Sequence, residues 1–296
     1  MKLFNTIIGA AAVLTVTLAA SAPAAAAEQK IVVVAAENFY GDVARQIGGD
    51  RVTVTSVLNN PDQDPHLFET TPSLVRRIAA ANLVIYNGAA YDPWMDKLLN
   101  VAAAPGRAVI VAADLVHKHA GDDPHLWYDP PTMPAVATAL AATLSTIDPP
   151  HKSDYAARLK TFLASLAPLN EKIAAIADKY AGTPVTATEP VFGSMAAALR
   201  LTMRNPSFQL AVMNNTEPSA RDLARFEADL KTHNVRVMFY NTQAADRLVR
   251  RLVDMAHAAN VPVVGVTETC PPGLTYQAWM LRELDATEKA LAGPAS

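Results

Sequence analysis

The chain has 296 residues, of which 51% are hydrophobic and 18% charged, with a formal net charge of −3. This apolar content excludes a disordered chain, and the single cysteine, Cys270, excludes a scaffold of internal disulfides. The small negative charge gives no general attraction to nucleic acid or anionic lipid. The length fits one large domain or two ordinary ones, and we expect a two-domain protein that binds something small.

The first 27 residues have the pattern of a secretory signal peptide. Lys2 supplies the positive start, and residues 7–20 form an uncharged apolar run that is too short to cross a bilayer comfortably. Residues 25–27 are alanines and predict cleavage before Glu28. A membrane anchor is the alternative. No cysteine lies near the predicted cleavage site, so a lipid cannot be attached there. Removing these 27 residues leaves 269, which we expect to be exported as a soluble protein without membrane insertion.

The first half of the mature chain alternates apolar, β-branched runs with amphipathic segments. Strands that alternate with helices imply right-handed crossovers and a parallel sheet. Ser73 is the candidate cap of one of the helices. We expect strands at residues 30–36, 52–58, 83–87 and 108–112, and helices at residues 39–47, 71–81 and 92–100.

Residues 154–180 contain no glycine and one proline, Pro168, and their apolar residues recur at helical spacing. The pattern predicts a helix of about 40 Å, which Pro168 kinks or divides. An ordinary surface helix is the alternative. We interpret residues 151–182 as a linking helix between an N-terminal α/β lobe, residues 28–150, and a C-terminal α/β lobe, residues 183–296.

The alternation of strands and helices resumes after the linking helix. The predicted fold is therefore α/β, with two parallel sheets and a ligand site in the cleft between the lobes, because open α/β sheets bind at the carboxyl ends of their strands. We expect strands at residues 184–188, 235–240 and 261–266, and helices at residues 191–200, 219–232 with Ser219 as cap, 244–259 and 276–292.

Two of the seven histidines share one local sequence, DPHL, in which His66 and His125 are the third residues. Both follow a predicted strand in a polar loop that presents the side chain. Neutral imidazole is the commonest metal ligand, and the aspartate before each proline could accept the second ring N–H. From the spacing alone, two ordinary loop histidines are as good an interpretation as two metal ligands.

Two carboxylates occupy matching places in the second half, since Glu189 and Glu268 each follow a predicted strand. Considered alone, each glutamate has the alternative interpretation of a helix cap or a solvated loop residue. The four candidates are separated by 59, 64 and 79 residues, whereas zinc-finger ligands come in short paired spacings. Such separations suit one metal site assembled from both lobes.

These segments resemble the cluster A-I solute-binding proteins, the periplasmic components of bacterial zinc and manganese ABC importers. The resemblance covers essentially the whole mature chain. It is most specific in DPHLFETTPS, DDPHLWYDPPTM, EPVFGSMA and VTET, at residues 64–73, 122–133, 189–196 and 266–269.

The resemblance implies a metal site of His66, His125, Glu189 and Glu268. The third ligand of the family is histidine in many zinc members and glutamate in many manganese members. The fourth is usually aspartate, so Glu268 is a departure that leaves the coordination number and the affinity open. Two imidazoles and two carboxylates suit manganese, zinc or ferrous iron, and the residue types do not identify the physiological metal.

Other residues near the second site have supporting interpretations. Trp127, Tyr128 and Asp129 share the loop of His125 and are expected to shape the site without coordinating. His117 and His119 stand where zinc members carry a His-rich loop, and a solvated loop is favoured over accessory metal collection.

The resemblance implies a periplasmic monomer that captures a divalent transition metal and delivers it to the permease of an ABC importer, without catalysis. A secreted metallohydrolase using the same His/Glu site is the alternative. Four protein ligands would close the water position that a catalytic zinc needs, and no HExxH or GxSxG motif occurs. A siderophore-type ligand is disfavoured because only 6% of residues are aromatic.

Overall fold

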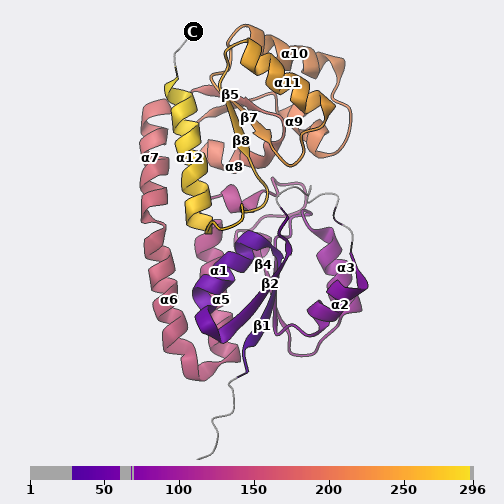
Figure 1. The fold of residues 1–296 in the computed structure, drawn as a ribbon, viewed down its shortest axis with the longest axis vertical. Coiled ribbons are helices and arrows are strands. Elements are labelled where there is room, and N and C mark those ends of the chain that lie inside the picture. Colours follow the sequence, from indigo (N-terminus) through magenta and orange to yellow (C-terminus); the bar gives the residue numbers. More distant parts are fainter. Residues whose placement is uncertain (1–28, 61–67, 69, 294–296) are drawn as a thin grey trace, which may run out of the picture.

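The computed structural model describes residues 29–60, 68 and 70–293, so the predicted signal peptide and His66 lie outside the described residues. The chain forms two α/β lobes, and two helices run end to end along one side of both (Figure 1). No helix in the described ranges is long and apolar enough to cross a membrane.

The N-terminal lobe contains a parallel sheet of order β2-β1-β3-β4. Alternate residues of β1 point to opposite faces, with Val33 and Ala35 in one apolar cluster and Val34 and Ala36 in another. Helices cover both faces, which explains the unbroken apolar runs of β1, β3 and β4 (Figure 1). The bounds are β1 Ile31–Glu37, α1 Asn38–Gly48, β2 Val52–Leu58, α2 Pro72–Ala79, β3 Leu83–Tyr86, α3 Pro93–Val101, β4 Ala108–Val111, α4 Ala112–Leu115 and α5 Thr132–Ile147.

The C-terminal lobe repeats this plan with a parallel sheet of order β6-β5-β7-β8. Phe208, Phe226 and Leu252 form an apolar cluster on one face, while Phe239 and Trp279 pack on the other. Both predicted parallel sheets are thus confirmed. The bounds are β5 Pro184–Ala187, α8 Gly193–Ala198, β6 Thr202–Arg204, α9 Pro206–Met213, α10 Ala220–Lys231, β7 Met238–Asn241, α11 Arg247–Ala258, β8 Val263–Val266 and α12 Tyr276–Ala292.

The predicted linking helix consists of α6, Lys152–Ser165, and α7, Ala167–Tyr180, which meet at Leu166. Pro168 lies in the first turn of α7, where its missing N–H costs no helical hydrogen bond. The expectation that Pro168 divides the helix is therefore confirmed. α6 packs on the N-terminal lobe and α7 runs beside α12 of the C-terminal lobe (Figure 1). The lobe boundaries at residues 150 and 182 remain predictions.

Some local predictions need correction. The cap of α2 is Thr71, not Ser73, because the Thr71 hydroxyl accepts the Leu74 N–H. Ser219 caps α10 as predicted. Four elements, β6, α4, α5 and α9, were not predicted from the sequence. The same is true of the 3₁₀ turns Gly49–Arg51, Leu126–Tyr128, Pro149–His151 and Pro190–Phe192.

One apolar core runs through both lobes. Its aromatic rings form a continuous series in which Phe39 lies 4.8 Å from Trp127, Tyr128 lies 5.3 Å from Phe192, and Phe192 stacks on Phe239 at 4.6 Å between centroids. The lobes are consequently joined by side-chain packing as well as by α6 and α7. Such an apolar interface restricts relative motion of the lobes.

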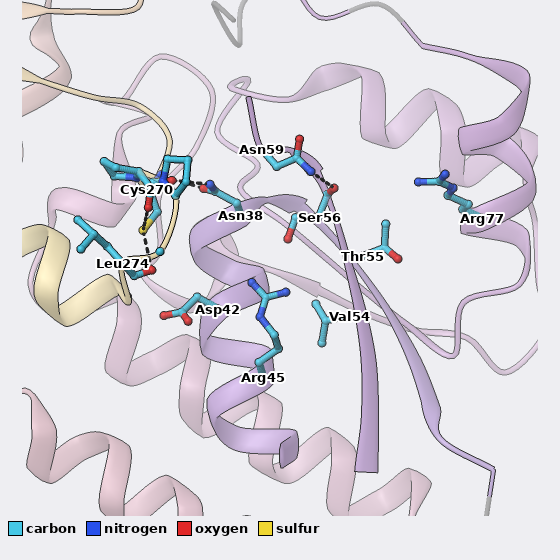
Figure 2. Close-up of a pocket in the computed structure, with 13 residues that line it drawn as sticks. Asn38, Asp42, Arg45, Val54, Thr55, Ser56, Asn59, Arg77, Cys270 and Leu274 are labelled. Carbon is cyan, nitrogen blue, oxygen red and sulfur yellow. Dashed lines mark hydrogen bonds between the residues drawn. The ribbon is translucent and has the colours of Figure 1, made fainter. Parts of the chain in front are cut away.

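Polar contacts reinforce this junction. The Asn38 side chain donates to the Cys270 carbonyl at 2.7 Å and accepts from the Cys270 N–H at 2.9 Å (Figure 2). Asp42 accepts the Tyr276 N–H at 2.9 Å. A cavity of about 460 Å³ lies beside these contacts, between α1, β2 and residues 270–274. Burial raises the pKa of the Cys270 thiol to about 12, so Cys270 is a packed thiol that stays protonated.

Glu283 of α12 lies buried where the lobes meet. Its carboxyl group accepts the Trp279 indole N–H at 2.7 Å, and burial raises its pKa from 4.5 to about 7. The Tyr128 hydroxyl oxygen lies 2.6 Å from Glu283 and 2.8 Å from the Thr267 carbonyl oxygen. One hydroxyl proton cannot serve both acceptors. A protonated Glu283 satisfies both contacts, because it donates to Tyr128 while Tyr128 donates to Thr267.

We predict that Glu283→Gln stabilises the metal-free protein at pH 8 and has little effect at pH 5. The native state retains the Glu283 proton between pH 4.5 and about 7, whereas the unfolded state loses it, so wild-type stability falls as pH rises through this range. The shift corresponds to about 3 kcal/mol. Denaturant unfolding at both pH values measures it, with Glu288→Gln on the same helix as control. Equal pH dependence in wild type and Glu283→Gln would contradict the prediction.

Candidate metal-binding site

Two predicted ligands and an asparagine meet at the carboxyl edge of the C-terminal sheet. Glu189 follows β5, Glu268 follows β8, and Asn241 is the last residue of β7, which lies between those two strands. The Asn241 Nδ2 donates to Glu189 Oε2 at 2.7 Å and to Glu268 Oε1 at 2.5 Å. The strand order therefore brings together two carboxylates that are 79 residues apart in the sequence.

His125 reaches this edge from the N-terminal lobe. Its Nε2 lies 3.9 Å from Glu268 Oε2, and its Nδ1 lies 2.7 Å from Asp123 Oδ1. The Asp123 carboxylate accepts the Nδ1–H, which leaves the lone pair on Nε2. This Nε2 is buried and has no hydrogen-bond partner within the described ranges. A buried acceptor without a partner costs free energy of folding. A metal ion bound to the Nε2 lone pair would remove this cost.

Asp123 is the aspartate before the proline, and it accepts the second ring N–H of His125, the role considered for it from the sequence. It also accepts the backbone N–H of His125 at 3.1 Å and the Ser194 hydroxyl at 3.3 Å. Burial alone would raise the pKa of Asp123, but these hydrogen bonds and the nearby His125 outweigh it and the pKa is lowered. Asp123 therefore stays ionised and orients the imidazole.

Further hydrogen bonds hold Glu268 in position. The Tyr91 hydroxyl donates to Glu268 Oε2 at 2.9 Å across the lobe junction. The Gln243 side-chain oxygen accepts the backbone N–H groups of Glu268 at 2.6 Å and Thr269 at 3.0 Å. Asn241 Oδ1 in turn accepts the Gln243 N–H at 2.9 Å. The carboxylate and its loop are thus tied to both lobes.

The aromatic neighbours of His125 form its apolar wall. Trp127 meets the His125 ring edge to face at 5.4 Å between centroids and lies 5.0 Å from Tyr91. Trp127 and Tyr128 are buried, and the Asp129 carbonyl accepts the Thr132 N–H at the start of α5. These contacts support the interpretation that the loop shapes the site.

The structure brings three of the four predicted ligands to one place: His125, Glu189 and Glu268. His66 lies outside the described residues. Among those that are described, no group of three or more His, Cys, Asp or Glu side chains is arranged to hold a metal ion, and Asn241 lies between the carboxylates. The four-residue ligand set therefore stays a prediction.

One expectation about the site was wrong. His125 was expected in a loop that presents its side chain, yet its exposed fraction is 0%, as is that of Glu268, because aromatic rings and the opposite lobe cover both. Glu189 is 6% exposed and lines a cavity of about 940 Å³ in the C-terminal lobe. Solvent therefore approaches the site from the side of Glu189. His117 and His119 are exposed, in agreement with a solvated loop.

Asn241 and Tyr91 were not predicted from the sequence. Asn241 directly follows the predicted strand of residues 235–240, and a polar residue at that point, between two strands that end in acids, was the available signal. Tyr91 has no comparable signal, because its partner Glu268 is 177 residues away.

Known zinc-uptake and manganese-transport proteins are similar to this chain. The sequence model of the family described as "ZnuA: Zinc-uptake complex component A periplasmic" matches residues 33–290. The high-affinity zinc uptake system protein ZnuA of Bacillus subtilis (strain 168) is 26% identical over 252 residues, which cover 77% of each chain. The manganese ABC transporter substrate-binding lipoprotein scaA of Streptococcus gordonii is 24% identical over 285 residues, covering 87% of this chain and 88% of that protein.

A solved structure has the same fold. The periplasmic zinc binding protein TroA from Treponema pallidum aligns with a TM-score of 0.76 and 20% sequence identity, covering 89% of this chain and 100% of that chain.

We predict that Asp123→Asn weakens metal binding about 10- to 100-fold, because an amide that presents its N–H to Nδ1 no longer fixes the imidazole tautomer. Asp122→Asn is the matched control, since Asp122 is exposed and accepts only the His119 N–H among its described contacts. Competition titration with a chromogenic chelator measures both affinities. Equal affinities in the two variants would show that Asp123 does not orient a ligand.

Proposed function

The chain belongs to the ZnuA family of metal-binding solute-binding proteins that serve ABC importers, and from this premise we propose that it captures Zn²⁺ or Mn²⁺ in the periplasm and delivers the ion to a membrane permease. Members of this family are transport binding proteins and not enzymes. The secreted metallohydrolase is therefore set aside. We further propose that the protein works as a monomer and that His66, His125, Glu189 and Glu268 are the ligands.

The observation that carries this proposal is the buried His125 Nε2, which faces Glu268 Oε2 at 3.9 Å. Two acceptors that face each other in a buried site are unfavourable unless a cation or a proton lies between them. Zinc bonds to imidazole nitrogen and carboxylate oxygen are each about 2.0–2.2 Å long, so one ion can bridge this gap. Asp123 already holds the imidazole in the tautomer that binding needs.

The proposed ligands come from both lobes, with the histidines from the N-terminal lobe and the glutamates from the C-terminal lobe. A bound ion would therefore strengthen the lobe junction, and its release would require the loops of the two lobes to separate locally. The cavity beside Glu189 is the proposed path of entry.

We predict that Zn²⁺ or Mn²⁺ raises the melting temperature of the wild type and that His125→Ala removes most of the shift. Binding to the native state alone adds about 2.7 kcal/mol of stability when the free ion is at one hundred times the dissociation constant. The shift should be larger at pH 8 than at pH 5, because imidazole ligands must be deprotonated and free imidazole protonates near a pH of about 6.5. Thermal unfolding with and without the ion measures the effect.

Two further variants make this test specific. Glu268→Asp should retain binding if the longer glutamate only replaces the usual aspartate of the family. His257→Ala is the control, since His257 is exposed on α11. An undiminished shift in the double variant His66→Ala, His125→Ala would refute the proposed site.

A further inference from the structure

The strand β2 forms one edge of the N-terminal sheet, and among the described residues it pairs only with β1. It has seven residues, whereas the other edge strands, β4, β6 and β8, have four, three and four. Proteins usually protect a long edge strand with charges, prolines or a bulge, because its free N–H and C=O groups can pair with another chain. The sequence of β2 is VTVTSVL, which contains no charge and no proline. This edge therefore lacks the usual protection against an added strand.

The cavity of about 460 Å³ described above lies along this edge (Figure 2). Val54, Thr55 and Ser56 of β2 line it together with residues 270–274 of the C-terminal lobe. The Asn59 side chain donates to the Ser56 carbonyl at 3.4 Å, a long hydrogen bond that a strand paired with β2 can replace. A chain lying in the cavity would thus meet β2 and contact both lobes.

Two arginines flank this edge from opposite faces of the sheet. Arg45 belongs to α1, which packs on the face of β1 that Val33 shares. Arg77 belongs to α2, which packs on the face that Val34 shares. Both arginines are exposed and line the cavity, and Figure 2 shows their side chains on opposite sides of β2.

The positive charge of these two side chains is not compensated within the described part of the chain. No described carboxylate lies within ion-pair distance of Arg45 or Arg77. Asp42 is the one acid among the residues that line the cavity, but its Oδ2 already accepts the Tyr276 N–H at 2.9 Å and the Gln46 amide at 2.7 Å. The cavity consequently favours an acidic ligand.

From these observations we infer that the β2 edge is a docking site for an extended acidic segment of a partner protein, which adds to the four-stranded sheet as a further strand. Main-chain hydrogen bonds to β2 supply affinity, and side-chain contacts supply specificity. Successive side chains of an extended chain point to opposite faces of a sheet. Two adjacent acidic residues of the segment therefore meet Arg45 on one face and Arg77 on the other.

A second copy of this chain fits the same edge less well. Two copies joined through their β2 strands would bring the arginines of each face together, and like charges that lie opposite each other across strands are destabilising. The charge of the cavity therefore favours an acidic partner over self-association.

The test uses a labelled, end-blocked peptide of seven residues, the length of β2, made of threonine and valine with two adjacent glutamates at its centre. The control peptide has two lysines instead. Two further peptides carry methyl groups on one or the other set of alternate backbone nitrogens. Each set of methyl groups blocks one edge of an extended peptide and leaves the other edge free to pair. Fluorescence anisotropy measures the dissociation constants, and hydrogen exchange measures protection of the amides of β2.

We expect the glutamate peptide to bind and the lysine peptide not to bind. Only one of the two methylated peptides should bind, and hydrogen exchange over residues 52–58 should slow in the complex. Arg45→Ala and Arg77→Ala should each weaken binding about 2- to 5-fold, the effect of losing one exposed ion pair. Arg76→Ala is the matched control, because Arg76 is exposed on the same helix as Arg77 but does not line the cavity.

Several results would overturn the inference. Equal binding of the two methylated peptides would show that the main chain of β2 takes no part. An equal loss in Arg76→Ala and Arg77→Ala would show only a general attraction to positive charge. A dissociation constant above about 1 mM for the glutamate peptide would exclude docking of this kind. A dimer of the free protein that the peptide dissociates would assign the edge to a second copy. None of these results bears on metal binding.

Discussion

The carboxylate of Glu268 has no exposed surface, and the polar structure around it compensates for its charge. Asn241 donates to it from its own lobe, while Tyr91 donates to it from the opposite lobe. A buried charge also needs a cation or further hydrogen bonds if it is not to destabilise the fold. The proposed metal ion supplies the positive charge. His125 Nε2 faces Glu268 Oε2, the oxygen that accepts from Tyr91. If the ion binds as proposed, metal binding and the junction of the lobes are parts of one electrostatic arrangement.

The apolar core limits how this arrangement can open. Trp127, Tyr128 and Phe192 connect the two lobes through ring contacts, and α6 with α7 spans both (Figure 1). Separation of the lobes would expose these rings to water, which costs free energy in proportion to the apolar area. We therefore expect the ion to enter and leave through displacement of loops near Glu189, where the structure already has a cavity. Rotation of whole lobes is disfavoured.

The sequence predicted most of the architecture because the periodicity of apolar residues and the spacing of strand and helix segments are local properties of the sequence. Residues 52–58 and 276–292 were predicted with the bounds that the structure has, and Pro168 was predicted to kink or divide the linking helix. The misses also have local causes. β6 has three residues, too few to show the alternation of a strand. The cap of α2 was assigned to Ser73, two residues after the actual cap Thr71.

The candidate site was only partly predictable for a different reason. The role of Asp123 could be anticipated because Asp123 lies two residues from His125. The roles of Asn241 and Tyr91 depend on partners 52 and 177 residues away, and those contacts exist only after both sheets have formed. The residue types of the proposed ligands were therefore visible in the sequence, whereas the hydrogen bonds that position these residues were not.

The position of the ion is the most direct test of this account. Crystals of the zinc-loaded protein, measured on both sides of the zinc absorption edge, would locate the ion by its anomalous scattering. We predict one ion at the lobe junction, bound by His66, by His125 Nε2 and by the carboxylates of Glu189 and Glu268. An ion held elsewhere, such as at His117 and His119, with no bond to His125 or Glu268 would contradict it.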